Sequence, residues 1–415
     1  MTVRPDRVQI GEVLRRLLSP AGLADPYGIY RQVRAAADAG RLSGRVLFRY
    51  VDVRAALEDR ELSADRVAAI LRPLGPDRTR VATLERTLRD IVVFQDQPDH
   101  RRLRRLLIQA FTPRMVAAAR PRIEELTDRL LDALPVDRDG VADLHRGLSY
   151  PLPAMVVAAL LGIPAADRDA FQGWALDLVH VVGAGPLTPQ VAERASQSAG
   201  RMGALMARLV AEHDDPTATD PTATDLLGAM ITATEDGRRL TAAELQANAL
   251  FLMTAGHETA ANMISNGVLS LLRHPRQLES LRADPSLLGA AAEEMLRYES
   301  PVQIAARVAH RDRELCGLDL RKGDPVILML GAANRDPGVY ADPDRFDVVR
   351  SGPPHLAFGH GAHFCLGAAL ARTEMEVVLA RLLDRYPTLR LADEPIDWQP
   401  TLDFRGPTRL PVNLW

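Results

Sequence analysis

The feature that most constrains the fold is one long helical pattern in the second half of the chain. Thr241–Glu244 reads TAAE, a capping box that marks a helix start, and apolar residues then recur at helical spacing to about His274. A helix of about 33 residues is roughly 50 Å long, so it must cross the core of a large helix-rich domain. The polar residues that exclude a membrane span are Thr254, His257, Glu258, Thr259 and Asn262.

Two residues near the middle of this helix are unfavourable there. Gly256 destabilises a helix by about 1 kcal/mol relative to alanine, and burial of Glu258 is far more costly unless the carboxylate is paired. Gly256 leaves space beside the backbone, and the Thr259 hydroxyl can bond a carbonyl of the preceding turn and open the helix locally. A site that needs space and a proton would explain these residues, and so would an ordinary surface turn.

The segment LAFGHGAHFCLG at 356–367 contains Cys365, one of only two cysteines. Zinc sites usually use C-x-x-C or paired histidines, so the nearby histidines fit zinc poorly. A catalytic thiol needs a positioned base, and His363 can point elsewhere. A buried structural cysteine would leave the glycines unexplained. A thiolate ligand to haem iron fits best, because the glycines let a flat macrocycle approach and the following helix stabilises a thiolate.

Composition restricts the class of protein. The 415 residues are 47% hydrophobic and 25% charged with a net charge of −3, which is ordinary for a soluble globular protein and gives no field that attracts nucleic acid or anionic lipid. Two cysteines cannot form the disulfide framework of a small secreted protein. The N-terminus has no continuous apolar run. We expect a soluble cytoplasmic protein that binds neither nucleic acid nor a membrane.

The remaining patterns predict a mainly α fold with a small β portion. Helical spacing is clear at 121–134, 196–213 and 371–386, and strand signals are short, at 44–50, 324–336 and 408–415. The repeat DPTATDPTATD at 215–225 is predicted to be a surface loop. We expect a single domain over 1–415. Its predicted parts are an α-rich body at about 95–395 and a β-rich portion from about 25–65, 302–335 and 396–415.

Charged residues form two further patterns. Glu294 and Arg297 are three apart and can pair on a helix, although most such pairs are solvated. In the helix predicted after Pro98, His100 and Arg104 share one face, which could hold an anionic group. The neighbouring face carries Arg101 and Arg105 and could bind a protein partner. A solvated basic helix would show the same pattern.

Taken together, the motifs resemble those of the cytochrome P450 monooxygenase family. FGHGAHFCLG at 358–367 resembles the family's haem-binding loop, and AGHET at 255–259 resembles its oxygen-activation turn. Glu294–Arg297 resembles its E-x-x-R motif, and DPDRF with Arg345 resembles the segment that completes the E-R-R network. The motifs stand in the family's order, and the length matches its soluble bacterial members. The resemblance implies a triangular helix-rich body with the long helix over the haem.

It also implies a role for individual residues. Cys365 would be the axial ligand of haem b. Thr259 would hydrogen-bond dioxygen or a relay water, Glu258 would supply protons, and Ala255 and Gly256 would form the oxygen groove. The residues expected to contact haem or its propionates are His100, Arg104, Arg307, His363, Phe358, Gly359 and Gly367. Those expected to form a structural network are Glu294, Arg297 and Arg345. The substrate pocket would include Val93, Phe251, Ala255, Val302, Ile304, Ala305, Asp403 and Phe404.

The same resemblance implies external electron donors. The chain is too short to include a reductase domain, so electrons would come from NAD(P)H through a ferredoxin reductase and a ferredoxin. An acidic partner would dock on Arg101, Arg102, Arg105 and Arg372. The protein would be a monomer that hydroxylates or epoxidises a small, largely apolar molecule, such as a polyketide or other specialised metabolite, either free or bound to a carrier protein. Oxidative coupling, desaturation, and a non-enzymatic haem sensor or carrier are the alternatives.

Overall fold

The computed structural model describes residues 8–76, 78–182, 187–213 and 225–415. Of the repeat predicted to be a loop, only Asp225 lies within the described residues. The α-helices are α1 (Ile10–Leu17), α2 (Pro20–Ala24), α3 (Pro26–Asp38), α4 (Tyr50–Glu58), α5 (Val67–Leu71), α6 (Ala82–Asp90), α7 (Asp99–Ala110), α8 (Pro113–Asp132), α9 (Pro151–Leu160), α10 (Arg168–Val182), α11 (Pro189–His213), α12 (Leu226–Thr232), α13 (Ala242–Leu272), α14 (Pro275–Ala283), α15 (Leu288–Tyr298), α16 (Leu330–Ala333) and α17 (Ala368–Arg385). The strands are β1 (Val8–Gln9), β2 (Leu42–Ser43), β3 (Val46–Leu47), β4 (Leu62–Ser63), β5 (Val141–Asp143), β6 (Ile304–Ala309), β7 (Arg313–Leu315), β8 (Leu318–Leu320), β9 (Pro325–Met329), β10 (Arg390–Leu391) and β11 (Pro411–Asn413).

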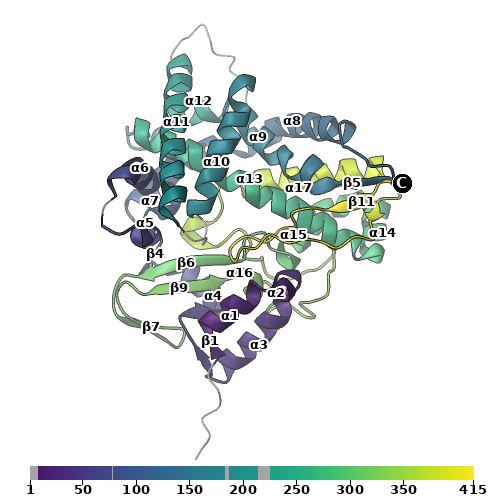
Figure 1. Cartoon of the computed structure of the whole chain (residues 1–415), viewed down its shortest axis with the longest axis horizontal. Helices are drawn as coiled ribbons and strands as arrows, with labels where there is room; N and C mark the ends of the chain where they lie inside the picture. Colours follow the sequence, from purple (N-terminus) through teal and green to yellow (C-terminus); the bar gives the residue numbers. More distant parts are fainter. Residues whose placement is uncertain (1–7, 77, 183–186, 214–224) are drawn as a thin grey trace, which may run out of the picture.

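Helix α13 runs through the helical layer, as predicted from its sequence pattern (Figure 1). Its capping box is complete, since the Thr241 hydroxyl accepts from the Glu244 N–H at 3.2 Å and the Glu244 carboxylate accepts from the Thr241 N–H at 2.9 Å. The helix packs against α9, α10, α11, α15 and α17. It is buried on nearly all sides, which is the environment that its mostly apolar sequence requires. Among the helices of the described residues, none combines the length and the apolar content of a membrane span.

A four-stranded sheet with the order β3-β9-β6-β4 lies beside the helical layer, and the N-terminal helices cover its other side (Figure 1). Its longest pairing joins β6 and β9 in antiparallel register, with Ala305 opposite Leu328 and Arg307 opposite Val326. Ser63 of β4 pairs with Val308 of β6. This pairing brings the segment that follows β4 next to the residues of β6, although about 240 positions separate them in the chain.

The β portion differs from the prediction in two respects. The region 25–65 is mainly helical, because α3 and α4 occupy most of it. Strand β11 does not join the four-stranded sheet but pairs with β5 and β10 in a separate sheet. The Leu144 N–H beside β5 also donates to the Leu410 carbonyl beside β11 at 2.9 Å. Strand partners this far apart in sequence carry no local signal, so the pattern predicted the strand but not its sheet. That the chain is a single domain stays a prediction.

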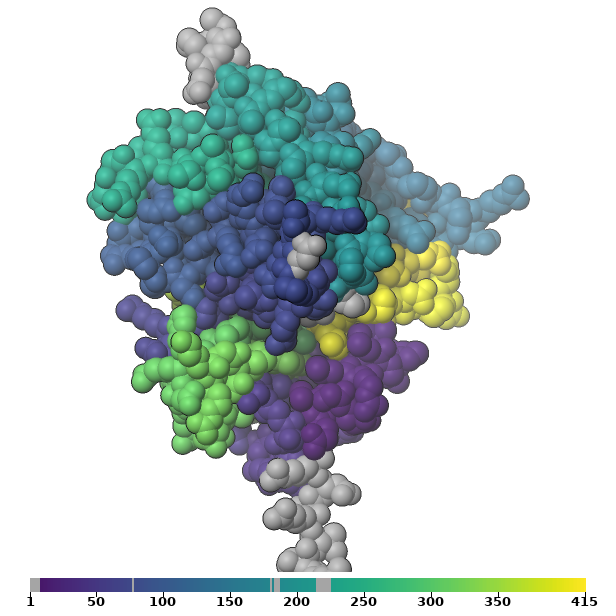
Figure 2. Space-filling model, turned by 60° about the vertical axis from the view of Figure 1, so that its left-hand side comes forward, coloured from purple at the N-terminus to yellow at the C-terminus, as the bar shows by residue number. Residues whose placement is uncertain are grey.

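Segment α5–α7 (blue) lies between the region of β6 to β9 (green) and helices α11 and α12 (teal) on the face in Figure 2. Asp96 within this segment holds it to the strand region, because the Ser63 hydroxyl and the Ala64 N–H both donate to the Asp96 carboxylate. Helix α7 is tied to the start of α13 by the ion pair between Arg102 and Glu244. The segment is therefore fixed from both sides.

The C-terminal loop packs directly on α13 at Gly406. A Cβ atom at this glycine would lie 2.0 Å from the Oδ1 and 2.4 Å from the Cγ of Asn262, whose side chain is bonded to Gln399. We expect Gly406→Ala to lower the free energy of unfolding by about 1–3 kcal/mol, as overpacking does in other cores. Urea unfolding monitored by circular dichroism measures this change in the free energy of unfolding.

Gly200 of α11 provides the matched control, because no atom lies within 4 Å of its hypothetical Cβ. Gly200→Ala is expected to raise stability by about 0.5–1 kcal/mol, as alanine does in helices. Adding Asn262→Ala to Gly406→Ala should recover part of the loss. Unfolding of Gly406→Ala at the same urea concentration as the wild type would contradict the described contact.

Candidate functional site

A cavity of about 670 Å³ lies between α13 and the loop that carries Cys365. Its walls come from the α5–α7 segment, α13, β6 with the residues before it, the C-terminal loop, and the segment 357–371. Most of the lining is apolar. The sequence-predicted residues on this wall are Val93, His100, Arg104, Phe251, Ala255, Gly256, Thr259, Val302, Ile304, Ala305, Arg307, Phe358, Gly359, His363, Cys365, Gly367, Asp403 and Phe404. Glu258 and the residues of the predicted structural network do not line it.

The loop before α17 presents the Cys365 sulfur to this space. Gly359 and Gly361 both have φ near +70°, a conformation that favours glycine, and a Cβ at Gly361 would lie 3.2 Å from the Leu57 carbonyl of α4. The Cys365 N–H donates to the Phe358 carbonyl at 3.0 Å and closes the loop. Helix α17 begins three residues after Cys365, with Gly367 as its N-cap. The sulfur faces the cavity instead of packing against other side chains.

Opposing effects act on the Cys365 thiol. Burial raises its pKa, while the Gly367 N–H and the guanidinium groups of Arg104 and Arg372 lower it. Arg372 lies over the Phe358 ring at 4.7 Å and is held by Glu293 at 2.6 Å. The protein alone therefore keeps this group as a thiol, and a bound cation would be needed to hold it as a thiolate.

A basic cluster stands at one edge of the cavity. The rings of His100 and His363 lie 3.9 Å apart, and Arg104 donates to the Phe364 carbonyl at 2.6 Å. Burial, reinforced by the neighbouring basic groups, lowers the pKa of His100 to about 4 and that of His363 to about 3. The buried His100 Nε2 has no hydrogen-bond partner. With the buried Arg307 of β6, the cluster offers two fixed positive charges and unfilled donors, which suit carboxylates.

The polar turn of α13 lies along the opposite wall. The Thr259 hydroxyl donates to the Ala255 carbonyl, and both residues line the cavity. The turn remains α-helical, so the hydroxyl does not open the helix as the sequence suggested. A Cβ at Gly256 would lie 3.2 Å from Val157 of α9, so this glycine also permits close helix packing. Burial raises the pKa of Glu258, one position before Thr259, to about 7, with a smaller contribution from Asp403.

Comparison with known proteins identifies the family. The family model described as Cytochrome P450 matches residues 72–400, most of the chain. The chain is a cytochrome P450. The biotin biosynthesis cytochrome P450 of Bacillus subtilis (strain 168) is 37% identical, covering 94% of this chain and 97% of that protein. The cytochrome P450 monooxygenase PikC of Streptomyces venezuelae is 39% identical, covering 94% and 91%.

Solved structures agree with this family. The structure of P450BioI in complex with hexadec-9Z-enoic acid ligated acyl carrier protein has a TM-score of 0.83 and 36% identity, covering 94% of this chain and 98% of that one. PksS, the cytochrome P450 of the Bacillus subtilis 168 bacillaene polyketide synthase, has a TM-score of 0.83 and 32% identity, covering 96% and 98%. The predicted fold class is confirmed. As a member of this family the chain is a monooxygenase enzyme that uses thiolate-ligated haem and dioxygen.

The residues of this cytochrome P450 fit haem. The sulfur of Cys365 and the hydroxyl of Thr259 border the same cavity, and the basic cluster stands at its edge. The unpartnered His100 Nε2 and the Arg104 guanidinium can donate to propionate oxygens. The Cys365 thiol faces the cavity, so iron bound there would contact the sulfur and displace its proton.

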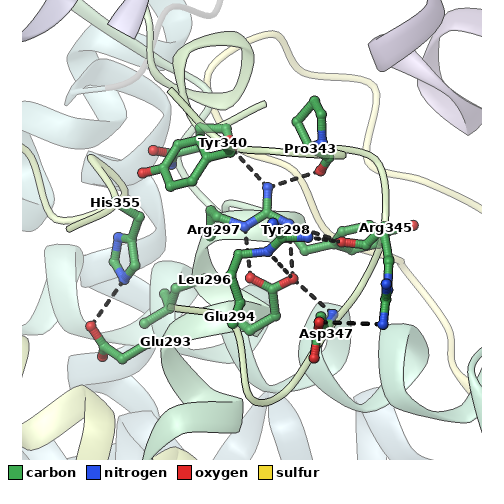
Figure 3. A network of polar contacts seen from close by, with 12 residues as sticks. Glu293, Glu294, Leu296, Arg297, Tyr298, Tyr340, Pro343, Arg345, Asp347 and His355 are labelled. Atoms are coloured by element: carbon green, nitrogen blue, oxygen red, sulfur yellow. Dashed lines mark hydrogen bonds and ion pairs between the residues drawn. The ribbon is translucent and has the colours of Figure 1, made fainter. Parts of the chain in front are cut away.

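Figure 3 shows a buried network of ion pairs and hydrogen bonds around Glu294 and Arg297 of α15. Arg297 donates to both carboxylate oxygens of Glu294, at 2.6 and 2.8 Å, as predicted from their spacing. It also donates to the carbonyls of Asn334 and Pro343 at 2.9 Å and of Arg345 at 3.2 Å. The network fastens α15 to the loop that follows α16.

Its third arginine is Arg350, and the assignment of this position to Arg345 is corrected. The side chain of Arg345 is 64% exposed and approaches Asp347 at 3.5 Å, so it contributes only its carbonyl to the network. The Arg350 side chain is 12% exposed and donates to Glu294 at 3.1 Å. The two arginines are five residues apart in one doubled-back loop, and their sequence does not show which one turns inward.

Two charged cavity residues were missed. Glu374 of α17 is buried, its Oε2 has no hydrogen-bond partner, and burial raises its pKa to about 8. Arg66 lies just before α5. An acid at helical spacing on the buried face of 371–386 could have indicated Glu374. No local pattern marks Arg66.

The network gives a test that separates its two arginines. Arg350→Ala leaves Glu294 with one fewer buried partner and is expected to lower the free energy of unfolding by about 3–5 kcal/mol. Arg345→Ala should change it by less than about 0.5 kcal/mol, as for exposed sites. Chemical denaturation of the haem-loaded variants, read from far-UV circular dichroism and the Soret band, measures both. Equal losses would contradict the geometry described here.

Proposed function

We propose that Cys365 is the axial ligand of the haem iron and that His100, Arg104, Arg307 and His363 bind the propionates. The observation that carries the proposal is that the Cys365 sulfur and the Thr259 hydroxyl border one apolar cavity with a basic edge. When bound, haem supplies the activation of dioxygen and the insertion of one oxygen atom into the substrate. Phe358, Gly359 and Gly367 border the same end of the cavity.

The polar turn of α13, which contains Glu258 and Thr259, would supply the protons for the reaction. Glu258, with a pKa of about 7, holds and releases a proton at neutral pH, which a general acid requires. The Thr259 hydroxyl, whose proton is engaged by the Ala255 carbonyl, has oxygen lone pairs available on the cavity side. In the proposed proton path, a water molecule would connect Glu258 and Thr259 with the cavity. Ala255 and Gly256 leave space beside the backbone for dioxygen.

The substrate is a small and largely apolar molecule. The residues predicted for the substrate pocket are mainly aliphatic on this wall, with Val93, Val302, Ile304 and Ala305, and they include the aromatic Phe251 and Phe404. Similar proteins include the cytochrome P450 monooxygenase PikC and 6-deoxyerythronolide B hydroxylase. A third, the cytochrome P450 PksS of Bacillus subtilis (strain 168), carries polyketide biosynthesis in its name. Hydroxylation or epoxidation of such a metabolite is the reaction we propose. The solved complex of P450BioI with an acyl carrier protein supports a carrier-bound substrate as a second form.

Electrons come from NAD(P)H through a ferredoxin reductase and a ferredoxin, and the enzyme acts as a cytoplasmic monomer. Of the arginines expected to bind the ferredoxin, Arg101 is exposed on α7. The other three already have partners on this chain. Their ion pairs are Arg102–Glu244, Arg105–Glu235 at 2.5 Å and Arg372–Glu293 at 2.6 Å.

A substrate screen tests this function. Apolar metabolites and fatty acids are added to the haem-loaded protein, and those that change the Soret band are incubated with ferredoxin, ferredoxin reductase, NADPH and isotopically labelled dioxygen. We expect a product that carries one labelled oxygen atom. Unlabelled dehydrogenated or dimeric products would instead indicate desaturation or coupling. Haem that binds ligands without any turnover would indicate a sensor or carrier.

Substitution of the cysteines tests the iron ligand. Cys365→Ala is expected to abolish the thiolate-type Soret position of the reduced, carbon monoxide-treated protein, because no thiol remains on the cavity wall. Cys316→Ala is the matched control and should leave that position unchanged, since Cys316 is exposed and outside the cavity wall. Survival of the thiolate-type band in Cys365→Ala would remove this residue from the site.

Substitution of Glu258 tests the proton path through its pH dependence. A carboxylic acid donates only while protonated, so wild-type turnover should fall as pH rises through about 7. Glu258→Gln should lower product formation by about 100-fold and remove this pH step. Glu279→Gln, at an exposed position of α14, is the control and should retain both rate and profile. A pH profile of Glu258→Gln identical in shape to the wild type would exclude Glu258 as the acid.

A further inference from the structure

Arg66 is a charged side chain on the cavity wall for which the roles proposed above leave no function. It is the N-cap residue of α5, and its Nε is buried and has no hydrogen-bond partner. Burial lowers the pKa of its guanidinium, and Asp403 on the same wall opposes that shift. Its guanidinium is a cation on a mostly apolar cavity wall, where a carboxylate of a ligand could pair with it in addition to Asp403.

The position of Arg66 is fixed by the chain around it. Ala64 and Val67 donate their N–H groups to Asp96 at 2.8 Å and to Asp65 at 3.0 Å. The guanidinium carbon lies 5.3 Å from the centroid of the Phe94 ring. Because the turn is already held in place, a ligand that pairs with Arg66 would not have to order it, which favours binding.

The charges near Arg66 identify the kind of ligand. Arg66 acts electrostatically on Arg307 and His363, so it stands at the basic edge of the cavity. Its fork of N–H donors matches the two oxygens of a carboxylate, and such a pair is strong where water is excluded. Two carboxylate sources can reach this edge, a haem propionate and an acid group on the substrate.

The charge balance favours the substrate. Haem carries two propionates, and the guanidinium groups of Arg104 and Arg307 supply one fixed positive charge for each of them. Arg66 is a third guanidinium, and Asp403 on the same wall offsets part of its charge. The residues that follow Arg66 on the wall, Ala69, Ile70 and Pro73, are apolar, so the space beside it suits an apolar substrate.

We propose that Arg66 binds the carboxylate of an otherwise apolar substrate acid inside the cavity. The inference rests on the proposed function, since it assumes that haem and substrate share this space. It narrows the substrate class to free acids, because an acyl group joined to a carrier protein as a thioester has no carboxylate. Asp403 would then exclude substrates with a second acid group near this end.

The test uses ω-(imidazol-1-yl)alkanoic acids of graded chain length and their methyl esters with the haem-loaded protein. The imidazole nitrogen binds haem iron and shifts the Soret band, so affinity is measured without knowledge of the natural substrate. At the best chain length we expect the acid to bind the wild type at least about 10-fold more tightly than its ester, as a charge-assisted pair provides. Arg66→Gln should remove this preference, and Arg66→Lys should retain part of it.

Arg72→Gln is the matched control, because Arg72 is an exposed residue that follows α5 and does not line the cavity. It should keep the full acid preference. Equal binding of acid and ester by the wild type at every length, or an unchanged preference in Arg66→Gln, would overturn the proposal.

A second measurement separates the two carboxylate sources. Haem transfer to apomyoglobin is followed for the wild type, Arg66→Gln and Arg72→Gln without added ligand. Faster haem loss from Arg66→Gln with an unchanged acid preference would assign Arg66 to a propionate and overturn the substrate proposal. Unchanged haem loss with a lost acid preference would support it. Failure of the proposed function would instead appear before any ligand is added, as a haem spectrum without thiolate ligation.

Discussion

Burial of the cavity wall away from bulk water determines which of its titratable side chains are charged. Burial keeps the imidazoles of His100 and His363 neutral, raises the pKa of the Cys365 thiol, and brings the pKa of Glu374 to about 8. The arginines keep their charge, because the pKa of a guanidinium is too high for burial to neutralise it at neutral pH. The cavity wall is therefore mostly apolar with a positively charged edge, an arrangement that favours a flat apolar ligand with carboxylates at one edge.

The framework holds these groups through contacts between distant segments. The pairing of β4 with β6 brings Arg66 and Arg307 together, and Asp96 fixes the turn between them and α7. Glu294 joins Arg297 and Arg350 in a second buried network. These contacts hold strands, loops and helix α15 together, so the position of the cavity residues depends on buried polar pairs as well as on apolar packing. Loss of one partner would leave a buried charge unpaired.

The sequence predicted features that depend on neighbouring residues. The capping box and apolar spacing located α13 to within two residues of its observed end, and the glycines around Cys365 predicted a tight loop before a helix. The four-residue spacing of His100 and Arg104 placed both on the cavity side of α7. Features that depend on distant contacts were not predictable in this way. The choice between Arg345 and Arg350, the sheet joined by β11, and the position of Arg66 on the cavity wall all follow from tertiary packing.

The ion pairs of α7 have a consequence for how quickly a partner finds this surface. Glu244 and Glu235 neutralise Arg102 and Arg105, and Glu293 neutralises Arg372 near the cysteine loop. Such pairs produce little field beyond about 10 Å in physiological salt, so the face attracts an acidic partner less than its arginine count suggests. The rate at which an acidic partner protein meets this face would then vary only weakly with ionic strength. The lifetime of the complex would depend on the contact area and on whether these ion pairs rearrange to bind the partner.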